Sequence, residues 1–326
     1  MDIEKYINYT SKCIDCNKCK NACSFLEKYN MTLKDVDKLS KLAYHCFLCG
    51  KCTEVCPVGI DGKEMIQEMR NEKLVGNEIV LNDKKYKTLI FEKNNYKFKN
   101  YRKSEKSVLF PGCNYTSLYP KTTKAIYEKL NEFEDIGIVY DCCGKPIAEL
   151  GMKNDEENII MNLEYRIKNL GIEEIITMCP NCYYYLKNKL SIPVKSIYEK
   201  CLQIGIELNY DFPIEKIYIP CPDRKDRIFI NQIMEMIGPV EIINNIQCCG
   251  LGGLGGIKEP EISKEYGNSL SGYRDKIVYT YCASCTGKFN RDGDGLVYHV
   301  LSSLFQTYEV ADTKKSFVNR MIKLIK

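Results

Sequence analysis

The chain has 326 residues, 44% of them hydrophobic and 28% charged, a composition typical of a globular protein with a substantial core. No signal-peptide pattern opens the chain, and no stretch reaches the roughly 18 apolar residues of a membrane span. We therefore expect a cytoplasmic protein without a transmembrane span, and the net charge of only +4 indicates no nucleic-acid partner.

Nineteen cysteines are the most unusual feature of the chain. In a reducing compartment, regular C-x2-C spacing indicates metal binding rather than disulfides. Near the N-terminus the run C-x2-C-x2-C-x3-C occurs twice, at Cys13, Cys16, Cys19 and Cys23 and at Cys46, Cys49, Cys52 and Cys56. In two-cluster ferredoxins the fourth cysteine of such a run completes the other cluster.

The two runs therefore predict two cubane [4Fe-4S] clusters. One would be held by Cys13, Cys16, Cys19 and Cys56, and the other by Cys46, Cys49, Cys52 and Cys23. Helix-start patterns at Thr32 and Asp61 predict a helical ferredoxin domain over residues 1–75. His45 precedes a predicted ligand, and we expect it to be a packing residue because four thiolates already close the site.

Residues 76–106 alternate basic and aromatic side chains. Such a pattern occurs in proteins that bind single-stranded nucleic acid. A connector with solvated lysines explains it more simply, because nothing else in the chain supports nucleic acid.

From residue 107 the sequence repeats itself. A single cysteine, a Cys-Cys-Gly and a C-x2-C occur twice, at Cys113, Cys142, Cys143, Cys179 and Cys182 and again at Cys221, Cys248, Cys249, Cys282 and Cys285. Each group follows a short apolar run, and helix-length segments lie between the runs, which predicts duplicated α/β repeats with parallel strands over residues 107–210 and 211–326.

Each set of five cysteines should meet at the carboxyl edge of its sheet. Five thiolates exceed the four that a cubane or a tetrahedral zinc ion requires, so the site is not expected to be an ordinary cubane. Gly250-x-Gly252-x-x-Gly255 matches a dinucleotide-binding pattern, but it begins inside the cysteine motif. A glycine loop that lets the backbone close on a cluster explains it better. The nineteenth cysteine, Cys201, is expected to be a buried side chain of a helix.

These motifs resemble a known family. Phe110-Pro111-Gly112-Cys113, Cys142-Cys143-Gly144 and Cys179-Pro180-Asn181-Cys182, with their second copies, are similar to the CCG cysteine-rich domains of heterodisulfide reductase. The order, ferredoxin domain first and duplicated CCG domain second, resembles the D-type catalytic subunit of that enzyme. The iron-sulfur subunits of glycolate oxidase and of the anaerobic glycerol-3-phosphate dehydrogenase share this layout.

The resemblance implies that each five-cysteine set holds a non-cubane [4Fe-4S] cluster and that a disulfide is cleaved between the two sets. Some relatives lose cysteines or hold zinc in one repeat. The second repeat departs from the pattern in spacer residues, with Pro220-Cys221-Pro222 and Cys282-Ala283-Ser284-Cys285.

The leading hypothesis is an iron-sulfur oxidoreductase that passes electrons from two cubanes to the CCG sets and reduces a small disulfide. Cations near the cysteines, which either hold an anionic substrate or are simply solvated, are Lys145, Arg224, Lys225 and Lys288. One alternative is the electron-transfer subunit of a flavoprotein dehydrogenase of the glycolate, lactate or glycerol-3-phosphate type, feeding a quinone pool. Another is a zinc-stabilised binding module.

The C-terminal segment has the pattern of a basic amphipathic helix. Its apolar residues are Phe317, Val318, Met321, Ile322 and Ile325, and its basic residues are Lys314, Lys315, Arg320, Lys323 and Lys326. It is expected either to contact the inner face of a membrane peripherally or to dock on its own domain.

Overall fold

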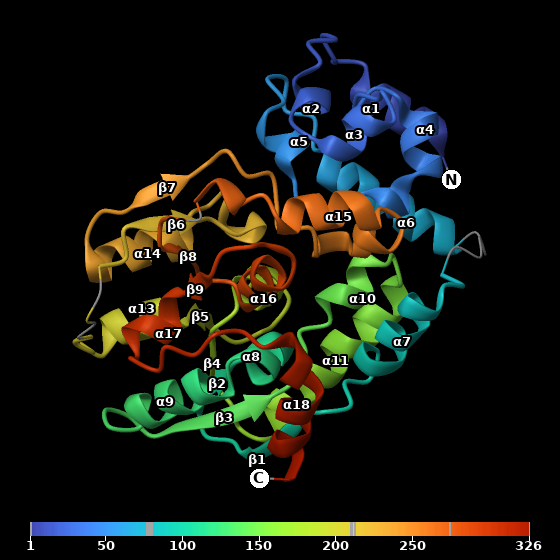
Figure 1. The fold of residues 1–326 in the computed structure, drawn as a ribbon. Helices are drawn as coiled ribbons and strands as arrows, with labels where there is room; N and C mark the ends of the chain where they lie inside the picture. Colours follow the sequence, from blue (N-terminus) through green and yellow to red (C-terminus); the bar gives the residue numbers. More distant parts are fainter. Residues whose placement is uncertain (1, 76–80, 209–210, 212, 274, 326) are drawn as a thin grey trace.

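The computed structural model describes residues 2–75, 81–208, 211, 213–273 and 275–325. Lys326 and the first five residues of the expected connector, 76–80, lie outside the described residues. The expected boundary between residues 210 and 211 lies at the edge of a described range. Figure 1 shows a small helical part at one end of the molecule and two α/β repeats beneath it.

Short helices and the loops between them make up the N-terminal part. Its helices are α1 (Ile3–Thr10), α2 (Lys18–Asn21), α3 (Ser24–Lys28), α4 (Val36–Lys41), α5 (Lys51–Glu54) and α6 (Gly62–Val75). The Asp61 carboxylate accepts a hydrogen bond from the Glu64 amide at 3.0 Å and begins α6 as predicted. The helix expected to start at Thr32 begins later, at Val36 of α4. In the turn before it, the Asp35 carboxylate accepts a hydrogen bond from the Thr32 backbone amide.

The segment between this part and the first repeat is more ordered than a connector requires. It contains helix α7 (Lys84–Lys93) and strand β1 (Asn100–Lys103). Strand β1 pairs antiparallel with the first sheet, and Tyr86 of α7 packs edge-on against Tyr44 with ring centroids 6.2 Å apart.

The first repeat is built around a sheet with the strand order β1-β3-β2-β4-β5. In chain order its elements are β2 (Ser107–Phe110), α8 (Gly112–Leu118), α9 (Pro120–Leu130), β3 (Ile136–Tyr140), α10 (Lys145–Glu149), α11 (Lys153–Asn169), β4 (Glu174–Thr177), α12 (Pro180–Leu186), β5 (Val194–Ser196) and α13 (Ile197–Gln203). Strands β2 to β5 are parallel.

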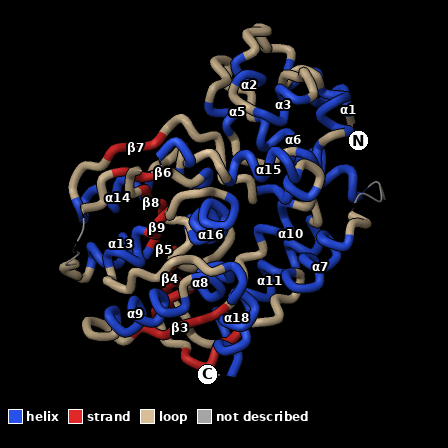
Figure 2. Tube along the Cα trace, viewed as in Figure 1, coloured by secondary structure: helices blue, strands red, loops and turns tan. Residues whose placement is uncertain are grey.

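The second repeat has the matching strand order β7-β6-β8-β9, and all of its strand pairs are parallel. Its elements are β6 (Lys216–Tyr218), α14 (Ile228–Ile237), β7 (Glu241–Ile243), α15 (Pro260–Gly267), β8 (Val278–Thr280), α16 (Ala283–Asp292), β9 (Val297–His299), α17 (Val300–Leu304) and α18 (Ser316–Ile325). The shared order, with helices around both sheets (Figure 2), confirms the predicted α/β fold with parallel strands.

One hydrophobic core joins the two repeats. It contains residues of the first sheet such as Val108 and Ile176 together with Phe229 and Val300 of the second repeat. Between them Tyr115 donates to the Tyr281 carbonyl at 3.0 Å and is hydrogen-bonded to His299. The second repeat also has a smaller cluster of its own, which includes Tyr218 and Phe289.

The C-terminal helix α18 docks on its own protein, lying against α8. Asn319 donates to the Ser117 carbonyl at 2.8 Å, Arg320 pairs with Glu92 of α7, and Phe317 packs edge-on against Phe98. Phe317 and Val318 nevertheless keep 60% and 56% of their surface exposed.

Candidate functional site

The cysteines of both repeats lie just beyond the carboxyl ends of their strands. In the first repeat Cys113 follows β2, Cys142 and Cys143 follow β3, and the Cys179 pair follows β4. The second repeat places its cysteines after β6, β7 and β8 in the same way. Because parallel strands bring their carboxyl ends to one edge, sequence-distant thiols meet there.

The five thiols of the first set form one continuous chain of contacts. Cys113 hydrogen-bonds with Cys142, Cys142 with Cys143, Cys143 with Cys182, and Cys182 with Cys179. Hydrogen bonds from Cys142 and Cys182 lower the pKa of the Cys143 thiol to about 5. The contact with Cys113 lowers the pKa of Cys142, but the contact with Cys143 and burial outweigh it and raise this pKa to about 12. The set thus has one acidic thiol beside protonated ones, and a bound metal would deprotonate the others.

The second set differs in one respect. Cys249, Cys282 and Cys285 are in hydrogen-bond contact as their counterparts are. Cys248 instead hydrogen-bonds with Cys49 of the N-terminal part, and this bond lowers the pKa of Cys49 to about 5. The second repeat is thus in direct contact with a predicted ferredoxin ligand.

Both sets open into one cavity of about 480 Å³. The cysteines that line it are Cys49, Cys113, Cys142, Cys143, Cys179, Cys182, Cys221, Cys249, Cys282 and Cys285. Two contacts tie the sets together across the repeats: Asn114 donates to the Ser284 hydroxyl at 2.5 Å, and Asn181 donates to the Cys282 sulfur at 3.7 Å. The spacer residues of both C-x2-C motifs therefore bridge the repeats.

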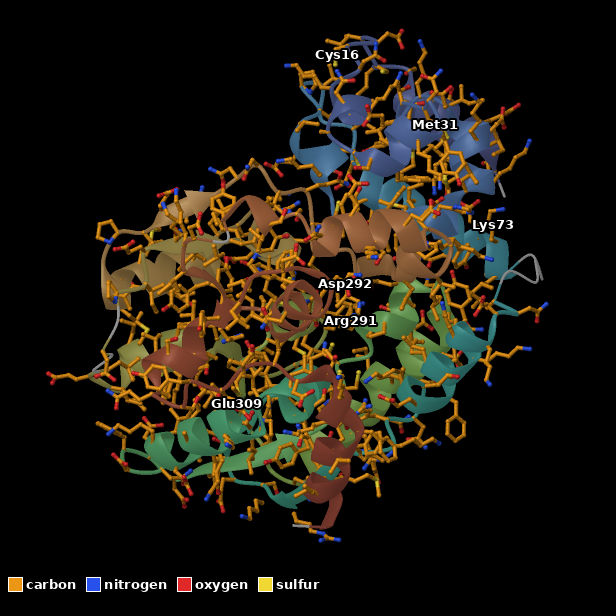
Figure 3. The ribbon with its side chains drawn as sticks, viewed as in Figure 1. Cys16, Met31, Lys73, Arg291, Asp292 and Glu309 are labelled. Atoms are coloured by element: carbon orange, nitrogen blue, oxygen red, sulfur yellow. The ribbon has the colours of Figure 1, made fainter. Side chains whose placement is uncertain are left out.

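Cationic side chains line the same cavity. They are Lys63, Lys93, Lys145, Lys288 and Arg291. Lys145 pairs with Glu149, while Lys288 and Arg291 both pair with Asp292, and Figure 3 shows Arg291 and Asp292 near the middle of the molecule. Arg224, predicted near the substrate, is not a lining residue. It donates to the Gln247 backbone carbonyl and holds the loop before Cys248.

Lys93 is a site residue that the sequence does not reveal, because it belongs to the basic segment read as solvated. Its side chain is 11% exposed and hydrogen-bonds with Cys113. Burial alone would lower the pKa of Lys93, but the electrostatic effect of the neighbouring Cys113 and Cys142 raises it overall. Lys93 also pairs with Glu92 at 2.7 Å, so its ammonium group is held beside the first set as one half of an ion pair.

The eight N-terminal cysteines lie in two groups. Cys13, Cys16, Cys19 and Cys56 line one small cavity. Cys23, Cys46, Cys49 and Cys52 lie close enough to act on each other's pKa values. Cys16 is exposed at the far end of the molecule (Figure 3).

The residues present fit iron-sulfur clusters. Backbone amides donate to sulfur at 3.3 Å, from Leu48 to Cys46, from Ile60 to Cys56 and from Gly250 to Cys248, as in cluster-binding loops. A side chain at Gly112 would bring its Cβ to 2.9 Å from the Cys182 sulfur, so glycine keeps the space beside that thiol free. Within the described residues no three His, Cys, Asp or Glu groups converge on a single metal ion. Thiolates of a cluster bind different irons and need not converge on one point.

The glycine loop that resembles a nucleotide motif packs against the inner ferredoxin loop. Added Cβ atoms at Gly252, Gly253 and Gly255 would lie 2.6 to 2.9 Å from the backbone of residues 46–47. The loop thus lets two backbones approach closely, as we expect of a glycine loop near a cluster.

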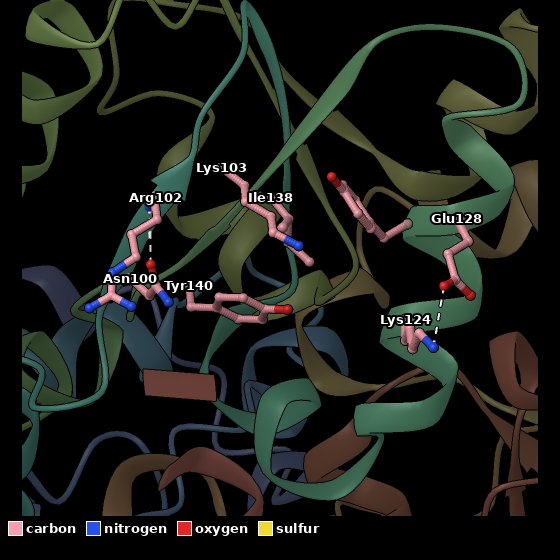
Figure 4. Close-up of a pocket in the computed structure, with 8 residues that line it drawn as sticks. Asn100, Arg102, Lys103, Lys124, Glu128, Ile138 and Tyr140 are labelled. Carbon is pink, nitrogen blue, oxygen red and sulfur yellow. Dashed lines mark hydrogen bonds and ion pairs between the residues drawn. The ribbon is translucent and has the colours of Figure 1, made fainter. Parts of the chain in front are cut away.

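A second cavity, of about 230 Å³, lies on the surface beside β1 and α9 (Figure 4). Arg102, Lys103 and Lys124 line it together with Tyr127 and Tyr140. Lys124 is paired with Glu128 at 3.3 Å. No cysteine lines this cavity, so it stands apart from the thiol chemistry.

Two family models match this chain in the order that the geometry predicts. The 4Fe-4S dicluster domain matches residues 12–60, and the cysteine-rich CCG domain matches residues 107–187 and again 220–290. The chain is a CCG iron-sulfur protein similar to the D-type subunit of heterodisulfide reductase. It therefore transfers electrons through iron-sulfur clusters, and the likeness indicates an oxidoreductase.

Relatives of this CCG iron-sulfur protein carry consistent names. Uncharacterised iron-sulfur proteins of Methanococcus maripaludis and Methanocaldococcus jannaschii are 24% and 25% identical over 96% and 93% of the chain. The B-type subunit of the CoM/CoB fumarate reductase of Methanothermobacter marburgensis is 24% identical over 84% of it. The matches span 72%, 70% and 66% of those proteins.

Likeness to solved structures is weaker. A hypothetical protein from Helicobacter pylori matches 97% of this chain and 74% of its own at 10% identity, with a TM-score of 0.46. Likeness at this level does not identify a shared fold. Among the described residues no helix is both long enough and apolar enough to cross a membrane.

Proposed function

We propose that this protein reduces a small disulfide in the cavity between its two CCG sets. The observation that supports this proposal is that thiols of both repeats line one cavity of about 480 Å³. Clusters held by these cysteines would fill much of this cavity, and a small disulfide bound in the space between the two sets would lie next to both of them. The balanced reaction is R-S-S-R plus two electrons and two protons, giving two R-SH.

Iron-sulfur clusters, when bound, supply one-electron transfer, and two such centres suit the two-electron cleavage of one S–S bond. Cys13, Cys16, Cys19 and Cys56 would hold an outer cubane, and Cys23, Cys46, Cys49 and Cys52 an inner one. The ten cysteines of the repeats would hold two non-cubane [4Fe-4S] clusters. Zinc in one repeat is the competing assignment.

The chain's own residues would place the substrate. Asn114 and Asn181, fixed by contacts across the repeats, hold the two sets at a constant separation. Lys93 provides positive charge beside Cys113, where a thiolate product would form. Electrons would come from a flavoprotein or from another one-electron donor in a complex, since the M. marburgensis relative is itself named as one part of a multi-subunit enzyme.

The test is spectroscopic. Anaerobically reconstituted protein, oxidised in the presence of candidate thiols, is expected to show a thiol-dependent paramagnetic signal. Cys142→Ser or Cys248→Ser should abolish this signal, because each removes a ligand from one set. Cys201→Ser is the matched control, since Cys201 is buried outside both sets and its substitution should leave the signal intact.

A second candidate is an electron-transfer subunit of a flavin-dependent dehydrogenase. The relative named as a subunit of a fumarate reductase favours a role as one part of a multi-subunit redox enzyme. Fully loaded protein that shows no thiol effect and copurifies with a flavoprotein would replace the first proposal with this one. Zinc without iron in the repeats would contradict both.

A further inference from the structure

The junction between the ferredoxin part and the second repeat is formed around one glutamine. Gln247 directly precedes Cys248, and its side-chain amide nitrogen donates to the Cys49 sulfur at 3.7 Å. Its amide oxygen accepts from the Ser24 backbone N–H at 3.2 Å and from the Tyr266 hydroxyl at 2.7 Å.

These partners fix which end of the amide faces the sulfur. A backbone N–H can only donate, so the group opposite Ser24 must be the oxygen. The nitrogen of Gln247 is then directed toward Cys49, and the orientation follows from the network. Ser24 follows Cys23, and Cys23 and Cys49 are predicted ligands of the same cluster. The Gln247 side chain therefore contacts one of these ligands and the residue next to the other.

The surroundings of Gln247 are apolar and packed. Phe47 and Tyr266 meet edge-on with ring centroids 5.1 Å apart and form a buried cluster with Cys248 and Ile262. Arg224 holds the backbone carbonyl of Gln247 from the other side. In such low-dielectric surroundings a hydrogen bond to sulfur is electrostatically stronger than in water.

We propose that electrons pass from the inner ferredoxin cluster into the second repeat through the contact of Cys49 with Cys248, and that Gln247 is the positioning residue of this junction. This inference rests on the proposed function. The step is a one-electron transfer in which the inner cluster is oxidised and the cluster of the second repeat is reduced. The first repeat shows no counterpart of this contact among the described residues, since Cys142 bonds with Cys113 and Cys143.

The hydrogen bond from Gln247 stabilises the extra negative charge of the reduced inner cluster. Gln247→Leu removes the donor and should lower the equilibrium constant for reduction by roughly tenfold, as expected for one hydrogen bond to a charged group. For a one-electron couple this is a fall of about 59 mV in midpoint potential. Gln247→Glu places a carboxylate there and should lower the potential further.

The measurement is an anaerobic redox titration of the full-length, cluster-loaded protein by electron paramagnetic resonance. Cys16→Ser identifies the outer cluster, so the remaining cubane signal belongs to the inner one. The matched control is Asn181→Leu, which removes the same kind of bond from Cys282 and should leave the inner potential unchanged. Tyr266→Phe, which removes one of the two bonds that orient the amide, should give a smaller fall.

An unchanged inner potential in Gln247→Leu, with all clusters loaded, would overturn this inference and leave the proposed function standing. A lower inner potential increases the driving force for transfer into the second repeat. A stopped-flow rate of second-repeat reduction that falls in Gln247→Leu despite this would therefore support the positioning role, and a rate that does not fall would contradict it. Absence of a cubane signal from the wild-type protein would instead contradict the proposed function itself.

Discussion

His299 is a single buried residue whose charge state is set by its surroundings. Its side chain is fully buried, its Nδ1 accepts from the Leu301 amide, and burial lowers its pKa to about 3. The unfolded value is about 6.5. The folded state thus keeps the imidazole neutral over a range in which the unfolded chain binds a proton.

The sign of the pH effect follows from this difference. The contribution of His299 to stability is fully present above about pH 6.5 and is lost as the pH falls toward 3. Between pH 7.5 and 5.5 the free energy of unfolding should fall by about 1 kcal/mol through this group. In His299→Gln the urea-unfolding midpoint should depend less on pH over this range. An identical dependence in both proteins would contradict the assignment.

At the scale of elements, the strands next to the cysteines were predictable because short apolar runs bounded by turn residues were clear in the sequence. Strands β1 and β5 lacked such a signal. Both lie at a sheet edge, where β1 is partly exposed and β5 has only the short sequence Val-Lys-Ser. The cysteine ligand sets stay predictions, although the structure brings together the thiols that the spacing grouped. Lys93 and Gln247 could not be found, because only the fold brings α7 and residue 247 to the cysteines.

The glycine loop is the element whose sequence signal was easiest to misread. Gly255→Ala would place a Cβ within 2.8 Å of the Cys46 carbonyl oxygen, in a contact of two backbones that cannot move apart cheaply. Overpacking of this kind costs about 1–3 kcal/mol, so the melting temperature should fall. Gly272→Ala is the control, because nothing lies within 4 Å of its Cβ position. Equal melting temperatures for the two variants would show that the loop is not held against residues 46–47.

At the scale of the whole molecule, Arg70 joins all three parts of the chain. It is fully buried and donates to the carbonyls of Ala43 and Cys46 in the N-terminal part, of Glu149 in the first repeat and of Gly253 in the second. A planar guanidinium with five N–H donors can serve four carbonyls at once.

Arg70→Met should therefore destabilise the protein by about 3–5 kcal/mol, because several buried carbonyls lose a charged donor. Chemical denaturation would measure this loss. Arg102→Met, on an exposed arginine of β1, should change stability by less than about 0.5 kcal/mol. A small effect at Arg70 would mean that the three parts are held together by apolar contacts alone.

The thiols become less accessible from one end of the molecule to the other. Cys16 is exposed, the inner ferredoxin cysteines are partly or fully covered, and eight of the ten cysteines in the repeats are buried. Dissolved oxygen would consequently attack the outermost centre first. Brief contact with air would then stop electrons from entering through the outer cluster while the clusters of the repeats stayed intact. Reconstitution of the outer cluster with iron and sulfide would repair this damage.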